Sequence, residues 1–108
     1  MKEYALRITE AAMEDLEEIY AYIAESLGSS QNANAQTQRI AEAVYSLAWM
    51  PERYPIFRFP GLEELKLRRV SVDRYLIFYL VDEDCVTVTD ILYGASDYGE
   101  TLQERHEK

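Results

Sequence analysis

The segment LRRVSVDRYLIFY, at residues 67–79, decides the fold of this chain. It joins two predicted strands, at residues 65–72 and 75–81, and the pair Asp73-Arg74 between them suits a tight turn. Residues 75–81 are apolar at successive positions, which is typical of a central strand covered on both faces. We therefore expect a β-hairpin in the middle of a sheet.

The first strand of this hairpin carries an irregular pattern. Its inward-facing positions shift between Leu67 and Val70, so that the apolar alternation breaks once. An extra residue in one strand has this effect, and we expect a β-bulge near Arg68 and Arg69.

Beyond the hairpin, the sequence predicts one more strand and little else. Residues 85–93 alternate as a strand does, and they follow a polar turn at residues 82–84. Residues 99–108 are polar and charged, which predicts a frayed tail.

Before the hairpin, the pattern predicts one strand and two helices. A short strand is expected at residues 3–8, and Thr9 is placed to cap a helix over residues 11–27. Gly28 suits a helix end, and a second helix is expected over residues 31–50. A loop with three prolines then leads into the sheet.

These elements give the order β-α-α-β-β-β and an α+β fold. The two helices form a hairpin that packs on one face of a small, mainly antiparallel sheet. We expect a single domain at residues 1–98, followed by a polar tail at residues 99–108. Because the central strand is apolar on both faces, the face opposite the helices is expected to remain open for another polypeptide.

Composition narrows the functional classes. The 108 residues carry 11 basic and 20 acidic side chains, a net charge of −9, and only residues 51–81 are locally positive. A basic nucleic-acid-binding domain is therefore not indicated. A single cysteine, Cys85, allows no intrachain disulfide, and no apolar run approaches a membrane span, so a cytoplasmic protein is expected. No metal-ligand spacing or phosphate loop is present, and we expect no cofactor.

Four segments together resemble the RelE/ParE superfamily of type II toxin–antitoxin toxins, and its ParE-like branch in particular. They are AAMEDLEEIYAYI (residues 11–23), MPERYP (50–55), LRRVSVDRYLIFY (67–79) and VTVTDILYGASDY (86–98). The resemblance implies a toxin, in some cases serving plasmid stabilisation, that a cognate antitoxin neutralises by wrapping its C-terminal segment around it. ParE-like members are associated with inhibition of DNA gyrase, and RelE-like members with cleavage of mRNA on the ribosome.

Two features depart from the family pattern. Family toxins are commonly basic, whereas this chain is acidic. A histidine often precedes the glycine of the closing triplet and an arginine often follows it, but here the triplet is Leu92-Tyr93-Gly94. A protein that kept the fold as a non-toxic binding module is therefore a further hypothesis.

Three arginines and three tyrosines are the predicted partner-binding residues. Guanidinium groups bind carboxylates and phosphates, although arginines here could also balance nearby acidic residues in solvent. Tyrosines in alternating register could form an aromatic binding face, or they could pack in the core beneath the helices. The six residues are Arg68, Arg69, Arg74, Tyr75, Tyr79 and Tyr93.

A ribonuclease is the alternative to a protein-binding toxin. It would use cations at Arg68 or Arg74 and a hydrogen bond from Tyr93 or Asp97. The only histidine, His106, lies in the predicted tail, and Asp97 equally suits a turn or helix cap. We therefore expect binding rather than catalysis. The expected partners are a cognate antitoxin and DNA gyrase, and the ribosome with its mRNA is a less favoured target. We expect no membrane association. The protein is expected to form a homodimer or a toxin–antitoxin hetero-oligomer.

Overall fold

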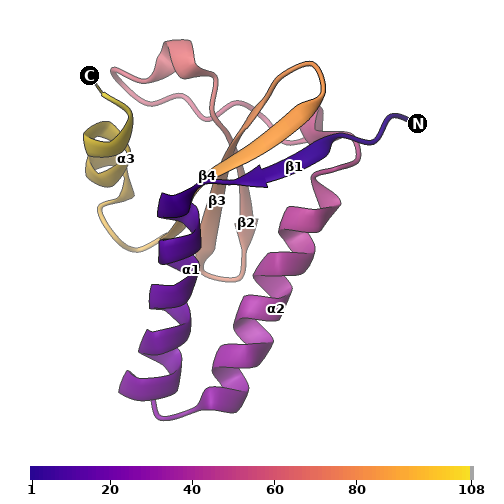
Figure 1. The fold of residues 1–108 in the computed structure, drawn as a ribbon. Helices are drawn as coiled ribbons and strands as arrows, with labels where there is room; N and C mark the ends of the chain where they lie inside the picture. The colour runs from indigo at the N-terminus through magenta and orange to yellow at the C-terminus, as the bar shows by residue number, and fades with distance from the viewer. Residues whose placement is uncertain (108) are drawn as a thin grey trace.

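The fold is a four-stranded sheet with helices on it, seen in a computed structural model that describes residues 1–107 (Figure 1). Within that range the long elements follow the predicted order, with one helix added at the end. They are β1 (Ala5–Ile8), α1 (Glu10–Ala21), α2 (Ser30–Ser46), β2 (Arg68–Val72), β3 (Tyr75–Val81), β4 (Cys85–Tyr93) and α3 (Tyr98–His106). None of the helices in the described part is both long and apolar enough to cross a membrane.

The sheet has the strand order β1-β4-β3-β2. β1 runs parallel to β4, and the other two pairs are antiparallel, so the predicted α+β class and mainly antiparallel sheet are confirmed. β3 and β4 have the predicted bounds. β2 is shorter than predicted, because a 3-10 turn at Glu63–Leu65 and the left-handed Lys66 (φ 58°) precede it.

The helical hairpin has the predicted caps. The Thr9 hydroxyl accepts a hydrogen bond from the Ala12 amide at 3.1 Å, which satisfies one of the free donors at the start of α1. After Ala21 the helix widens into a π-helical turn at Tyr22–Ser26, closed by a hydrogen bond from the Leu27 amide to the Tyr22 carbonyl. Gly28, with φ 71°, then reverses the chain into α2.

A first core lies between this helical hairpin and the sheet. The helices contribute small and branched apolar side chains, and alternate residues of the strands face them. The fully buried members include Ala12, Ala33, Ile40, Leu47, Ile77, Tyr79, Val86 and Val88.

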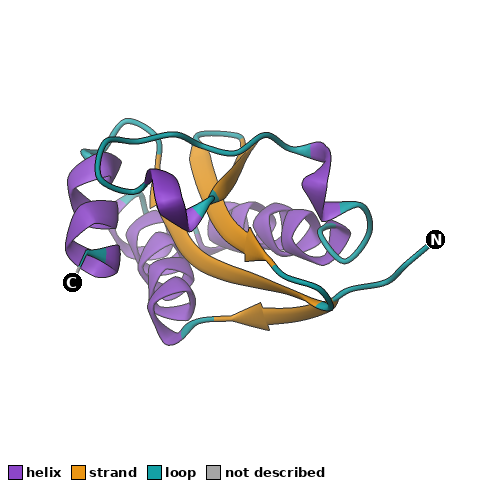
Figure 2. Ribbon diagram, turned by 90° about the horizontal axis from the view of Figure 1, so that it is seen from above, coloured by secondary structure: helices purple, strands orange, loops and turns teal. Residues whose placement is uncertain are grey.

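The opposite face of the sheet is covered by the chain itself, and the prediction of an open face is wrong. A second core forms around Phe78, Leu67 and Leu102, which are at most 1% exposed. The loop before β2 supplies further rings and side chains, and Figure 2 shows this loop crossing over the strands toward α3. The sequence pattern showed correctly that both faces of β3 are buried, but not that the covering segments belong to this chain.

The helix α3 replaces the predicted frayed tail. Asp97 caps it by accepting a hydrogen bond from the Glu100 amide at 3.3 Å, which agrees with the capping role considered above. Leu102 is fully buried, and Gly99 lies so close to the Phe59 ring that a Cβ there would come within 2.3 Å of a ring carbon. Residues 98–106 therefore belong to the folded body, and only Lys108 lies outside the described residues.

The irregularity of the sheet is also displaced from its predicted place. The β2–β3 register is continuous from Arg68 to Val72, and the bulge lies instead on β4, where Thr89 is skipped between the partners of Phe78 and Tyr79. The apolar shift at the start of β2 has a simpler cause. Leu67 faces the second core and Val70 faces the first, so both faces are buried without a bulge.

Candidate functional site

A groove beside the helical hairpin gathers three of the six predicted residues. We call it the tyrosine groove; it has a volume of about 830 Å³ and lies between α1, the π-helical turn and the ends of β3 and β4. Arg74, Tyr75 and Tyr93 line one side. The other lining residues are Asp15, Glu18, Ile19, Tyr22, Ile23, Leu27, Asn32, Ile91, Leu92 and Ser96.

Strand register brings the two sheet tyrosines together. Tyr75 and Tyr93 are paired across β3 and β4, and their ring centroids are 5.7 Å apart at an interplanar angle of 53°. The Gly94 amide donates to the Arg74 carbonyl at 2.8 Å, which fixes the turn beside them. Burial raises the pKa of Tyr75 above its usual 10, and the phenols of Tyr93 and Tyr22 act in the same direction.

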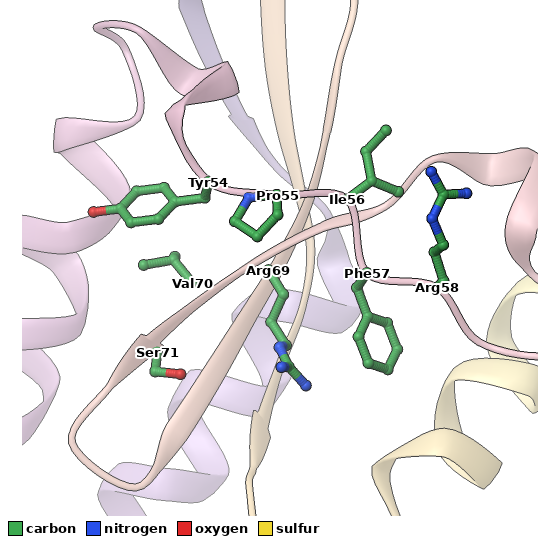
Figure 3. A pocket seen from close by; sticks show the side chains of 8 residues that line it. All are labelled: Tyr54, Pro55, Ile56, Phe57, Arg58, Arg69, Val70 and Ser71. Carbon is green, nitrogen blue, oxygen red and sulfur yellow. The ribbon is translucent and has the colours of Figure 1, made fainter.

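A second hollow lies along the outer edge of β2. This edge cleft has a volume of about 540 Å³, and its lining residues are shown in Figure 3: Tyr54, Pro55, Ile56, Phe57, Arg58, Arg69, Val70 and Ser71. The guanidinium of Arg69 stacks over the Phe57 ring at 4.7 Å from its centroid and lies 3.4 Å from the Tyr98 hydroxyl. Arg69 is thus separate from the tyrosine groove.

The edge of β2 beside this cleft is largely open. Strand order places β2 at the end of the sheet, and an isolated bridge between Ile56 and Arg68 covers only its first residue. Among residues 1–107 no other strand pairs with the outer side of β2. The remaining backbone groups form a template on which an extended segment could pair.

The last two predicted residues hold the framework together. Arg68 donates to the carbonyls of Tyr54 at 2.6 Å and Glu52 at 3.2 Å, and its side chain is only 17% exposed. Tyr79 is fully buried, and its hydroxyl donates to the Pro51 carbonyl at 2.6 Å. Burial raises the pKa of Tyr79 to about 12. Both side chains therefore anchor the loop that follows α2.

A buried charge network, which the sequence analysis missed, fixes α3. Arg105 donates two hydrogen bonds to Asp15 at 2.8 Å each and one to Asp90 at 3.0 Å. Nε2 of His106 lies 2.8 Å from Asp90, and the Thr89 hydroxyl donates to the same carboxylate at 2.6 Å. Asp90, the only charged residue of β4, was the sequence signal that could have indicated such a partner.

Electrostatics within this network follow from its hydrogen bonds. Burial opposes ionisation of Asp90, but hydrogen bonds from His106, Thr89 and Arg105 outweigh it and hold its pKa below the usual 3.8. Arg105 pairs with the carboxylates of both Asp15 and Asp90. Among the described residues, no group of three or more histidine, cysteine or acidic side chains could hold a metal ion.

Comparison with solved structures shows the same fold in several toxins. The chain resembles one described as the chromosomal ParDE toxin–antitoxin system from P. aeruginosa, with a TM-score of 0.69 and 20% identity over 84% of this chain and 96% of that one. It also resembles the RelBE2 toxin–antitoxin complex from Mycobacterium tuberculosis, with a TM-score of 0.60 and 19% identity over 89% and 97%. A third is the archaeal RelE–RelB complex from Pyrococcus horikoshii OT3, with a TM-score of 0.56 and 16% identity over 86% and 97%.

Sequence comparison identifies the family. No curated protein matches the chain. A family described as the ParE toxin of the type II toxin–antitoxin system parDE matches residues 6–98. This range includes the helical hairpin, the sheet except for Ala5, and the lining residues of both hollows, whereas most of α3 lies outside it. The chain therefore belongs to the ParE toxin family of type II toxin–antitoxin systems.

Proposed function

We propose that this protein is a toxin that acts in the cytoplasm by binding a protein target, such as DNA gyrase, and that a cognate antitoxin neutralises it. The family match over residues 6–98 is the observation that carries the proposal. The tyrosine groove and the edge cleft are the surfaces we assign to these partners.

The tyrosine groove has the chemistry of a protein-binding surface. Tyr22 is 57% exposed and Tyr93 is 42% exposed, although both carry large aromatic rings. Aromatic side chains with polar tips are enriched at interfaces because they bury much area and still satisfy a hydrogen bond. Ile19 of α1 and Ile23 of the π-helical turn continue this surface, so a partner segment bound here would contact both aromatic and aliphatic side chains.

The edge cleft supports neutralisation by an extended segment of the antitoxin. A strand added to β2 would pair with its open backbone groups, and main-chain hydrogen bonds of this kind supply affinity in many peptide complexes. Arg58 and Arg69 line the cleft, and carboxylates of the added segment would complement them.

Cleavage of mRNA is less well supported, because only two of its candidate groups, Arg74 and Tyr93, come together. Arg68 is bound to two backbone carbonyls, whereas Arg74 and Tyr93 line the tyrosine groove. His106, the last residue of α3, is paired with Asp90. A net charge of −9 also repels a polyanion at long range.

Induction of the chain in bacterial cells tests the proposal. We expect growth arrest and altered supercoiling of a reporter plasmid while transcripts stay intact, and growth should recover when the product of the adjacent reading frame is co-expressed. Tyr93→Ala and Arg74→Ala should weaken growth arrest, whereas Tyr20→Ala and Arg7→Ala, on exposed positions outside both hollows, should not.

The outcomes separate the alternatives. Ribosome-dependent cuts in mRNA would favour the ribonuclease. Normal growth despite tight antitoxin binding would favour a non-toxic binding module. A chain that neither arrests growth nor binds the co-expressed product would contradict the proposal.

A further inference from the structure

The helical side of the tyrosine groove is acidic. Between Arg7 and Arg39 the chain contains no basic residue, but it contains six acidic ones: Glu10, Glu14, Asp15, Glu17, Glu18 and Glu25. Two of the six line the groove. Asp15 is already paired with Arg105, whereas Glu18 is exposed and makes no ion pair within residues 1–107.

The other sides of the groove present three aromatic rings from three different elements. Tyr22 comes from the π-helical turn, Tyr75 from β3 and Tyr93 from β4. The phenols of Tyr93 and Tyr22 both raise the pKa of Tyr75, which agrees with three phenols gathered in one place. The face of a tyrosine ring attracts a cation, and several rings beside a carboxylate recognise ammonium and guanidinium groups.

We propose that the tyrosine groove binds one arginine or lysine side chain from an apolar segment of a partner protein. The cation would lie among Tyr22, Tyr75 and Tyr93 and pair with Glu18, and flanking apolar residues would pack on Ile19, Ile23 and Leu27. This inference rests on the proposed function for the identity of the partner, and it specifies the chemistry that the partner must present. The net charge of −9 favours the approach of a basic segment.

Arg74 limits what the groove accepts. It enters the groove from the turn between β2 and β3, and no ion pair within residues 1–107 neutralises it. Like charges across an interface are repelled, so Arg74 disfavours a run of several basic residues. The groove is therefore better suited to a single basic residue between apolar ones than to a polybasic tail.

A titration with small probes on the full chain tests the cation site. Nα-acetyl-arginine amide and its citrulline counterpart have nearly the same shape, but only the arginine probe is charged. We expect the arginine probe to shift the NMR signals of the Tyr22, Tyr75 and Tyr93 rings. It should bind about two- to fivefold more tightly than the citrulline probe, as for an exposed cation–π contact.

Matched variants locate the effect. Glu18→Gln should weaken binding of the arginine probe about two- to fivefold, whereas Glu17→Gln, with the same change of charge on the same helix but outside the groove, should not. Tyr93→Leu should weaken it similarly, and Tyr20→Leu, which is exposed but outside the groove, serves as its control.

Three results would overturn the inference: no shift with either probe, equal affinity for both probes, or equal effects of the two glutamate substitutions. If the wild-type chain arrests growth but the probes give any of these three results, the cation site is refuted and the proposed function is not. If the wild-type chain neither arrests growth nor binds the antitoxin, the proposed function is refuted instead.

Discussion

Arg105 should contribute strongly to the stability of the fold, although it is partly exposed and lies in a segment whose sequence resembles a disordered tail. Its guanidinium is held by Asp15 and Asp90, which are 5% and 0% exposed. Hydrogen bonds to Asp15 raise the pKa of Arg105 above its usual value, so the group is charged at every accessible pH. Arg105→Met would keep the length of the side chain and remove the guanidinium from both carboxylates. Within residues 1–107, Asp15 would then have no cation, and Asp90 would keep only its contacts with His106 and Thr89.

The expected loss follows from the cost of an uncompensated buried charge. Breaking a buried ion pair by removing one partner costs about 3–5 kcal/mol. The Arg105 side chain remains 30% exposed, so water can partly replace it, and we expect a loss of about 3 kcal/mol, at the lower end of that range. Arg39→Met is the matched control, because Arg39 pairs with an exposed carboxylate of Asp73 and should change stability little.

Urea unfolding at pH 7 and again at pH 4 measures this prediction. The pKa of Asp90 is lowered in the folded protein, so its ionised carboxylate stabilises the wild-type fold. This contribution to the free energy of unfolding is present above about pH 5 and is lost as the pH falls through 3.8 and below. The variant should lose less on acidification, since a protonated carboxyl no longer requires a cation, and the gap between the two chains should narrow. A gap of less than 1 kcal/mol at pH 7, or one that widens at pH 4, would refute the reasoning.

Further predictions concern the two cores. Leu102→Ala should destabilise the fold by about 2–4 kcal/mol, whereas exposed Glu104→Ala on the same helix should stay within about 0.5 kcal/mol in urea unfolding. Tyr79→Phe should cost about 1 kcal/mol by removing a buried hydrogen bond. Because the folded pKa of Tyr79 is about 12, the wild-type chain should lose stability as the pH rises above 10, and unfolding curves of this variant should lack that loss. Gly99→Ala should destabilise the fold by about 1–2 kcal/mol, measured by thermal unfolding. The new Cβ would displace the Phe59 ring, and the free energy that this costs exceeds the gain in helix propensity.

Much of the fold could be predicted because local signals and long-range packing agree. The turn at Asp73, which has φ 55°, and the polar turn before β4 delimit β3 and β4, whose bounds the apolar pattern predicts correctly. Thr9 and Gly28 likewise mark real helix boundaries. The π-helical turn after Ala21 has no such signal, because it depends on how the hairpin packs.

The helix α3 could not be predicted, because its stabilising contacts lie far away in the sequence. One apolar residue, Leu102, anchors it, and the charges that look solvent-exposed in the sequence pair with Asp15 and Asp90. The face of the sheet that α3 covers was therefore interpreted as open.

The six predicted binding residues lie at different places in the structure for a related reason. Arginines and tyrosines look alike in sequence whether they face a partner or a backbone carbonyl. Arg68 and Tyr79 meet the loop after α2, Arg69 stacks on Phe57, and only Arg74 with the remaining tyrosines reaches the groove. Alternation along a strand identifies the side of the sheet on which a residue lies, but it does not identify what that side meets.

The alternation of β3 between two apolar layers also governs how the molecule comes apart. Ile77 and Tyr79 insert on one side of this strand while Phe78 inserts on the other, so neither layer can melt without pulling away the backbone that supports its neighbour. The helical hairpin and the C-terminal helix, which the ion pair between Asp15 and Arg105 also joins, are thereby coupled into one cooperative unit. Reporters placed on opposite sides of the sheet will register the same transition.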